Sequence, residues 1–182
     1  QDYSLSWTTP WVFGKPTSLG VDLFNTRRIN PFQGSISAYV EKNRGGTLRV
    51  GPRFEEDKYH LNLAYTYSEV TLTNVQDVFR GPLSEGTSVF SSVSAEFARD
   101  TRDNIWDPTS GTRHSLGAQL SGGPFQGSIH FFKPSLSSAL HYHLFSVEDY
   151  PFVMTIANRA AYITQFGETR EVPVFNRFYV GG

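Results

Sequence analysis

The side chains with the clearest chemical potential form two small groups. His141 and His143 flank a single tyrosine, so an extended strand would place both imidazoles on one face, as two metal ligands. Glu96 and Asp100 likewise share a face and could act as an acid–base pair of carboxylates. No third ligand lies near the two histidines in the sequence, which argues against a metal site. Arg102 closely follows the two carboxylates, which argues for ion pairing instead of an acid–base pair. We therefore interpret these groups as polar side chains and an ion-pair network, and expect no catalytic residue, metal or cofactor.

A charged reversal of the chain is the most specific motif. Asp107-Pro108 opens a turn because proline presets φ, and Gly111 ends it because glycine adopts positive φ without steric cost. Pairing of Asp100 with Arg113 across the reversal is geometrically possible. The motif comprises Asp100, Arg102, Asp103, Asn104, Pro108, Ser110, Gly111 and Arg113. We interpret it as a structural hairpin that fixes the register of its two strands.

The composition excludes several classes of protein. The chain has 182 residues, no cysteine and a formal net charge of −1. Without cysteine, neither a disulfide framework nor a thiolate metal site can form. The charge argues against a nucleic-acid partner bound by bulk positive charge. No apolar run reaches the length of a transmembrane helix. Sixteen glycines, nine tyrosines and fifteen phenylalanines suit an all-β protein with many turns.

Alternation of apolar and polar residues predicts about eight antiparallel β-strands and no helix. Segment 59–67 is the clearest, because tyrosines lie at both ends of its apolar face and leucines between them, as in a membrane strand that crosses two aromatic girdles. The other strands are expected at 2–8, 17–25, 37–54, 88–102, 113–121, 129–145 and 152–163. A polar loop is expected at 26–31 and a bulge or loop at 43–46. Pro134 and Asn158 do not fit this pattern.

The same alternation predicts which face each side chain occupies. A curved sheet should carry its polar face on the concave side, facing a lumen, with Asp22, Glu96, Arg102, Gln119, His141 and Arg159. The apolar side should carry Leu61, Leu63, Tyr65, Val93, Phe97, Leu116, Leu120, Leu136 and Leu140. Short turns alternate with longer loops, as in outer-membrane barrels. A soluble β-sandwich binding module would instead bury the apolar face against a second sheet, and a small eight-stranded barrel would close on itself.

Several motifs resemble one known family. The string 100–113 resembles the periplasmic hairpin of the BamA family of outer-membrane protein assembly factors, and segments 3–11 and 18–24 resemble that family's second and third barrel strands. The residues that resemble the start of its long sixth extracellular loop include Arg177, Phe178, Gly181 and Gly182. The resemblance implies that residues 1–182 are a partial barrel domain, strands two to nine of a sixteen-stranded up-and-down transmembrane β-barrel. The periplasmic POTRA domains and the closing half of the barrel are expected outside the chain.

The resemblance also implies a function without covalent chemistry. Members of this family fold and insert β-barrel proteins into the cell outer membrane of Gram-negative-type bacteria, and are not enzymes. The expected partners are the lipid bilayer, unfolded outer-membrane proteins and, mainly through the POTRA domains, the lipoproteins of the assembly complex; nucleic acid is not expected. Two relatives of this family remain as alternatives, a TamA-type translocation factor and a two-partner secretion pore.

Overall fold

The chain forms a meander of β-strands. The computed structural model describes residues 2–31, 37–77, 85–167 and 169. The strands are β1 (Tyr3–Thr9), β2 (Thr17–Pro31), β3 (Ser37–Phe54), β4 (Tyr59–Thr73), β5 (Gly86–Asp100), β6 (Gly111–Ser121), β7 (Phe131–Val147), β8 (Tyr150–Ala161) and β9 (Thr164–Gln165). A short 3₁₀ turn, η2 (Gly123–Phe125), lies between β6 and β7. No helix in the described part of the chain is long and apolar enough to cross a bilayer.

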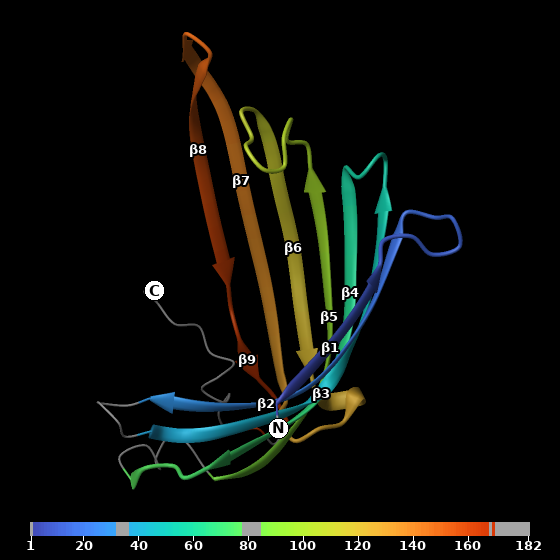
Figure 1. The fold of residues 1–182 in the computed structure, drawn as a ribbon, viewed down its shortest axis with the longest axis vertical. Helices are drawn as coiled ribbons and strands as arrows, with labels where there is room; N and C mark the ends of the chain where they lie inside the picture. The colour runs from blue at the N-terminus through green and yellow to red at the C-terminus, as the bar shows by residue number, and fades with distance from the viewer. Residues whose placement is uncertain (1, 32–36, 78–84, 168, 170–182) are drawn as a thin grey trace.

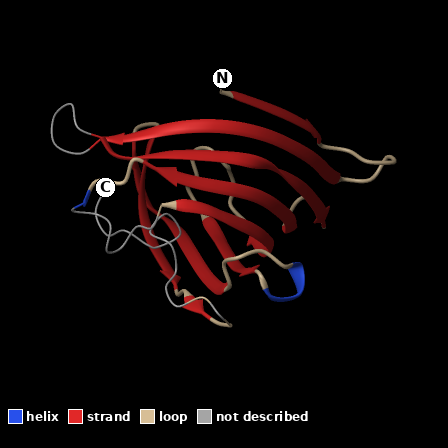
Figure 2. Cartoon of the chain, turned by 90° about the horizontal axis from the view of Figure 1, so that it is seen from below, coloured by secondary structure: helices blue, strands red, loops and turns tan. Residues whose placement is uncertain are grey.

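Each strand from β1 to β8 pairs with the next one in sequence, and every pairing is antiparallel (Figure 1). The sheet is strongly curved and remains open, as its view from below shows (Figure 2). Within the described residues, β1 and β8 are its two edges, and β9 extends the line of β8 along β7. The predicted up-and-down antiparallel meander is therefore confirmed.

The register gives the two faces different chemistry, because successive side chains of a strand point to opposite sides. One row of paired residues crosses the concave face and is mostly polar or small: Thr8, Gly20, Arg49, Ala64, Ser94, Gln119 and Lys133. The row one residue away points outward and is entirely apolar or aromatic: Trp7, Val21, Leu48, Tyr65, Val93, Leu120 and Phe132. The predicted apolar set lies on this outward face.

The outward face is open to the surroundings over its whole width. Leu116 is 63% exposed, and Leu136, its partner on β7, is 52% exposed. The buried apolar cluster is small and consists of Val70, Leu72, Val75, Phe90 and Phe131. It lies toward the ends of β4 and β5 that the longer connections join. An apolar surface of this extent is far larger than a soluble monomer carries, and no second sheet covers it among the described residues.

Two segments expected to be a loop or a bulge are regular strand instead. Residues 26–31 are not a loop: β2 continues to Pro31 and pairs with β3, so that Arg27 lies opposite Lys42. Residues 43–46 contain no bulge. The ladder from β3 to β4 runs through them without a shift, and Gly45 permits this because a Cβ there would lie 2.2 Å from the Tyr67 carbonyl oxygen. Backbone pairing with neighbouring strands overrides the weak strand propensity of these polar residues and glycines.

Pro134 lies where the strand beside β7 is interrupted. Ser135 pairs with Ala161 of β8, and Phe132 pairs with Thr164 of β9, in one continuous register. Between these pairs the Tyr162 N–H donates to the Pro134 carbonyl oxygen at 3.1 Å, but proline has no N–H to donate in return. The missing bond accounts for the gap between β8 and β9.

Asn158 lies on the outward face opposite Ser138. Its row is polar: Ser138 is paired with His114 of β6, and the Ser138 hydroxyl lies 2.9 Å from His114 Nδ1. The asparagine therefore extends a polar track on the apolar face and is not a register error.

We predict that the same new charge costs far more stability on the outward face of β6 than on the concave face. In the full-length protein embedded in a bilayer, Leu116→Arg should lower the free energy of unfolding by about 2–4 kcal/mol, because it places a guanidinium against hydrocarbon. Gln119→Arg, on the concave face, is the matched control; it lies opposite Lys133 in the ladder, so it should cost less than about 1 kcal/mol. Denaturant unfolding in lipid vesicles measures both. Equal losses would contradict the assignment of the faces.

Candidate functional site

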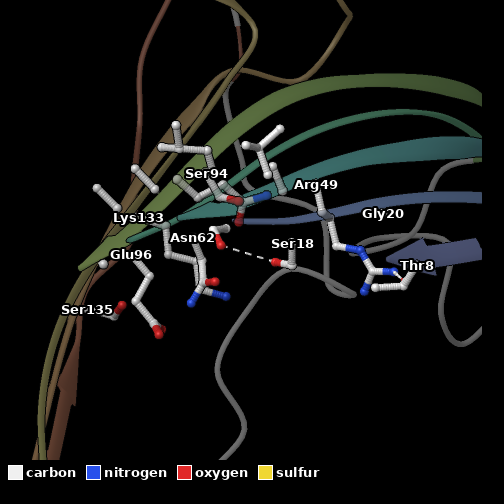
Figure 3. A pocket seen from close by; sticks show the side chains of 17 residues that line it. Thr8, Ser18, Gly20, Arg49, Asn62, Ser94, Glu96, Lys133 and Ser135 are labelled. Carbon is white, nitrogen blue, oxygen red and sulfur yellow. Dashed lines mark hydrogen bonds between the residues drawn. The ribbon is translucent and has the colours of Figure 1, made fainter. Parts of the chain in front are cut away.

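The concave wall contains a cavity of about 540 Å³ that polar side chains and small residues line together (Figure 3). Its lining comes from every strand between β1 and β7, with small residues between the polar ones. The polar lining residues are Thr8, Ser18, Arg49, Asn62, Ser94, Glu96, Gln119, Lys133 and Ser135. Two of the residues predicted to face the lumen, Glu96 and Gln119, are among them, and the Gln119 amide donates to Ser92 at 3.2 Å.

Arg49 joins three strands on this wall. Its Nη2 lies 2.9 Å from Asp22 Oδ1 on β2 and 3.4 Å from Thr8 Oγ1 on β1. The Ser6 hydroxyl donates to the same Asp22 oxygen at 2.5 Å. Gly20 lies beneath the guanidinium, where a Cβ would stand 3.1 Å from two of its nitrogens. Alternation along the sequence predicts Asp22 on this face, but only the pairing register brings Arg49 to it.

The hairpin after β5 begins with a two-pronged ion pair. Arg102 Nε lies 2.9 Å from Asp100 Oδ1, and its Nη2 lies 2.6 Å from Oδ2; both side chains are 13% exposed. Arg102 Nη1 also donates to the Ile105 carbonyl at 3.2 Å. Arg113 lies opposite Asp100 in the ladder, with its Nε 3.9 Å from Oδ2. β5 ends at Asp100, so Arg102 lies in the connection, where the backbone hydrogen bonds of Thr101 with Thr112 and of Asp103 with Ser110 continue the register of the ladder.

Asp103 organises the rest of the reversal. Its Oδ1 accepts the backbone N–H groups of Asn104, Thr109 and Ser110 at 2.9, 3.0 and 3.1 Å. Its Oδ2 accepts the Thr109 hydroxyl. The hydrogen bond from the Thr109 hydroxyl, together with those from the backbone, holds the pKa of Asp103 well below its ordinary value. One ionised carboxylate thus closes the loop from both ends.

Asn104 and Gly111 complete the reversal. The Asn104 side-chain oxygen accepts the N–H groups of Trp106 and Asp107 at 2.9 and 3.3 Å. Gly111 has φ of +101°, and a Cβ there would lie 2.3 Å from the Thr101 carbonyl oxygen. Pro108, between these two residues, is half-buried. The connection is therefore held by its own side chains and backbone rather than by packing against the sheet.

The two histidines serve separate hydroxyl partners. His141 Nδ1 lies 3.0 Å from Thr155 Oγ1 on β8, and His143 Nε2 lies 2.8 Å from Ser146 Oγ. Across the described ranges, no three His, Cys, Asp or Glu side chains are grouped closely enough to hold a metal ion. Arg159 lies opposite Ser137 on the concave face.

The residues predicted at the start of the sixth loop, Arg177, Phe178, Gly181 and Gly182, lie outside the described residues.

Comparison with known proteins identifies one family. The Omp85 superfamily domain matches residues 1–182. The outer membrane protein assembly factor BamA of Nitratidesulfovibrio vulgaris is 33% identical over 187 aligned residues, which cover 97% of this chain and 21% of that protein. The crystal structure of BamA from Haemophilus ducreyi lacking POTRA domains 1–3 has the same fold, with a TM-score of 0.79, 19% identity and coverage of 100% of this chain and 36% of that one. The chain thus spans about a fifth of the length of the curated relative.

We predict that the hairpin contributes to stability through two separate features. Arg102→Ala leaves the Asp100 carboxylate without its main partner, and Gly111→Val forces a side chain into the Thr101 carbonyl. Each change should lower the free energy of unfolding by roughly 1–3 kcal/mol. Ser110→Ala is the matched control, because the hydrogen bonds of Ser110 described here use its backbone. The temperature at which the folded band is lost in gel-shift assays measures the effect, and an unchanged temperature for Arg102→Ala would contradict it.

Asp103 should make the hairpin sensitive to acid. Its pKa is lower in the folded protein than in the unfolded chain, so its stabilising contribution is complete above the unfolded value and is lost as the pH falls toward the folded one. The difference in melting temperature between wild type and Asp103→Asn should therefore be largest near neutral pH and shrink below about pH 4. Asp107→Asn is the control. A difference that stays constant with pH would contradict the assigned role of the carboxylate.

Proposed function

This chain belongs to the Omp85 superfamily, and from that premise we propose that residues 1–182 are part of the wall of a larger barrel that folds and inserts β-barrel proteins. The protein is located in the outer membrane of a Gram-negative-type bacterium. The observation that carries the proposal is the two-faced sheet, whose outward rows are apolar and whose concave wall is polar. A similar assembly factor, BamA, matches along almost the whole chain.

The partners follow from this arrangement. The outward face would contact lipid, and unfolded outer-membrane proteins would be the substrates, whose strands such a factor brings into a bilayer. The proposed contribution of residues 1–182 is a stable wall with defined faces. Contacts with the lipoproteins of an assembly complex would be made mainly by POTRA domains, and the segment with Arg177 and Gly181 would lead into a sixth extracellular loop.

We assign the hairpin of residues 101–110 to the control of register. A slip of one residue between β5 and β6 would turn Leu116 and Leu120 toward the lumen and bring polar residues against lipid. The ion pair of Asp100 with Arg102 and the loop closure by Asp103 define where the chain turns, and hence which residue of β6 meets each residue of β5. Assembly activity then depends on the hairpin only through the folded barrel.

The activity can be tested with the full-length protein reconstituted in lipid vesicles. Addition of a urea-unfolded outer-membrane protein should give heat-modifiable, folded product several-fold faster than empty vesicles do. Vesicles that contain a barrel of similar size without assembly activity serve as the control. If folding is not accelerated but a soluble passenger crosses the membrane, the protein is a secretion pore and the proposal is wrong.

The role of the hairpin is tested in the same assay. Arg102→Ala should lower the amount of folded protein in the vesicles but leave the activity per folded molecule unchanged, within about twofold. Ser110→Ala should change neither quantity. A variant that folds with wild-type stability and yet loses all activity would make the hairpin a contact site for a partner instead.

A further inference from the structure

We call the apolar and aromatic rows of the outward face the apolar band. On β4 this band ends at Tyr67. Tyr59 and Tyr67 bound an apolar stretch of about the length that a tilted strand needs to cross the hydrocarbon. The next outward residue is Glu69, which pairs in the ladder with Arg44 of β3. This pair lies on the side of the apolar stretch away from the hairpins 55–58 and 101–110, four pairs before the ladder of β3 and β4 ends at Val40 and Thr73. It therefore lies at the level of lipid headgroups in the leaflet away from those hairpins.

Arg44 and Glu69 form part of a groove at this level. Arg44 Nε and Nη2 lie 2.8 and 2.5 Å from one oxygen of Glu69, and the Arg44 side chain is 71% exposed. The groove, of about 330 Å³, is also lined by Tyr3, Leu23 and Tyr67. Tyr3, Leu23 and Tyr67 form its apolar part, next to the apolar residues of the strands. The Arg44 guanidinium forms its charged part.

Two more basic residues extend the charge beyond the groove. Arg27 and Lys42 are paired with each other on β2 and β3, point to the same outward side as Arg44, and are exposed. We call Arg27, Lys42 and Arg44 the basic patch. Glu69 is its one ion-pair partner among the described residues. By strand alternation, Glu41 points to the other face, where it lies opposite Arg28.

We propose that the basic patch and its groove bind an anionic lipid, with a phosphate group on the patch and an acyl chain along Tyr3, Leu23 and Tyr67. Like charges placed side by side on neighbouring strands destabilise a bare sheet, and a phosphate between Arg27 and Lys42 removes that repulsion. Arginine adds planar hydrogen-bond donors that match phosphate oxygens. Among the described contacts, Arg44 uses Nε and Nη2 for Glu69, so its Nη1 can serve a phosphate oxygen. The site depends on the barrel lying in a membrane, and not on assembly activity.

The test uses the full-length protein in phosphatidylcholine vesicles that contain spin-labelled phosphatidic acid or spin-labelled phosphatidylcholine. The immobilised fraction of each label gives the selectivity for the phosphate lipid. Wild type should prefer phosphatidic acid, and Arg27→Gln/Lys42→Gln should lower the preference roughly fivefold or more, since each basic residue near an anionic surface contributes about that factor. Arg44→Gln/Glu69→Gln, which removes the ion pair without an unpaired charge, should lower it as well.

The matched control is Arg28→Gln/Arg159→Gln, which removes two positive charges from the concave face. It should leave the selectivity within twofold of wild type. Equal losses in this control and in the patch variant would show an effect of net charge, and no loss in the patch variant would show that the patch does not bind lipid; either result overturns the proposal. The acceleration of folding, measured on the same samples, reports separately on the proposed function.

Discussion

The rest of the structure depends on the register of one antiparallel ladder. Inside a bilayer, every backbone N–H and C=O needs a partner within the sheet, since hydrocarbon offers none. The ladder from β1 to β8 provides these partners, and its shifts fall near strand ends, between Asn30 and Pro31 and between His143 and Phe145. Because side chains alternate along each strand, the register also decides which residues meet lipid and which meet water.

The concave wall shows how the polar face is held without a dry core. Glycine and serine leave room for long side chains to lie across neighbouring strands. Arg49, for example, lies above Gly20 and contacts the Thr8 hydroxyl. Hydroxyl pairs such as Thr47 with Thr66 and Ser115 with Ser137 bridge adjacent strands. Individual bonds of this kind contribute modestly to stability. They give polar side chains of the wall local partners; among the described residues, Asn43 Oδ1 and Arg53 Nε are the buried side-chain atoms without one.

The hairpin and the basic patch lie on opposite sides of the apolar band, and both use charge outside it. On one side, Asp103 collects backbone donors and needs no contact with the sheet. On the other, Arg44 and Glu69 pair on the outward face where the tyrosines end. Charge in these places costs little desolvation, because water and headgroups remain accessible. The apolar rows between them set the thickness of membrane that the wall fits.

The sequence by itself determined the strand pattern, the two faces and the hairpin, since alternation and turn residues are local signals. It could not determine that residues 26–31 continue β2, because only the partner strand makes a polar segment extended. It left Pro134 unexplained, since its missing donor matters only beside the break between β8 and β9. The contacts of Arg49 with Asp22 and of Arg44 with Glu69 join residues far apart in the chain. Tertiary structure decided these pairs, because register is a property of two strands together.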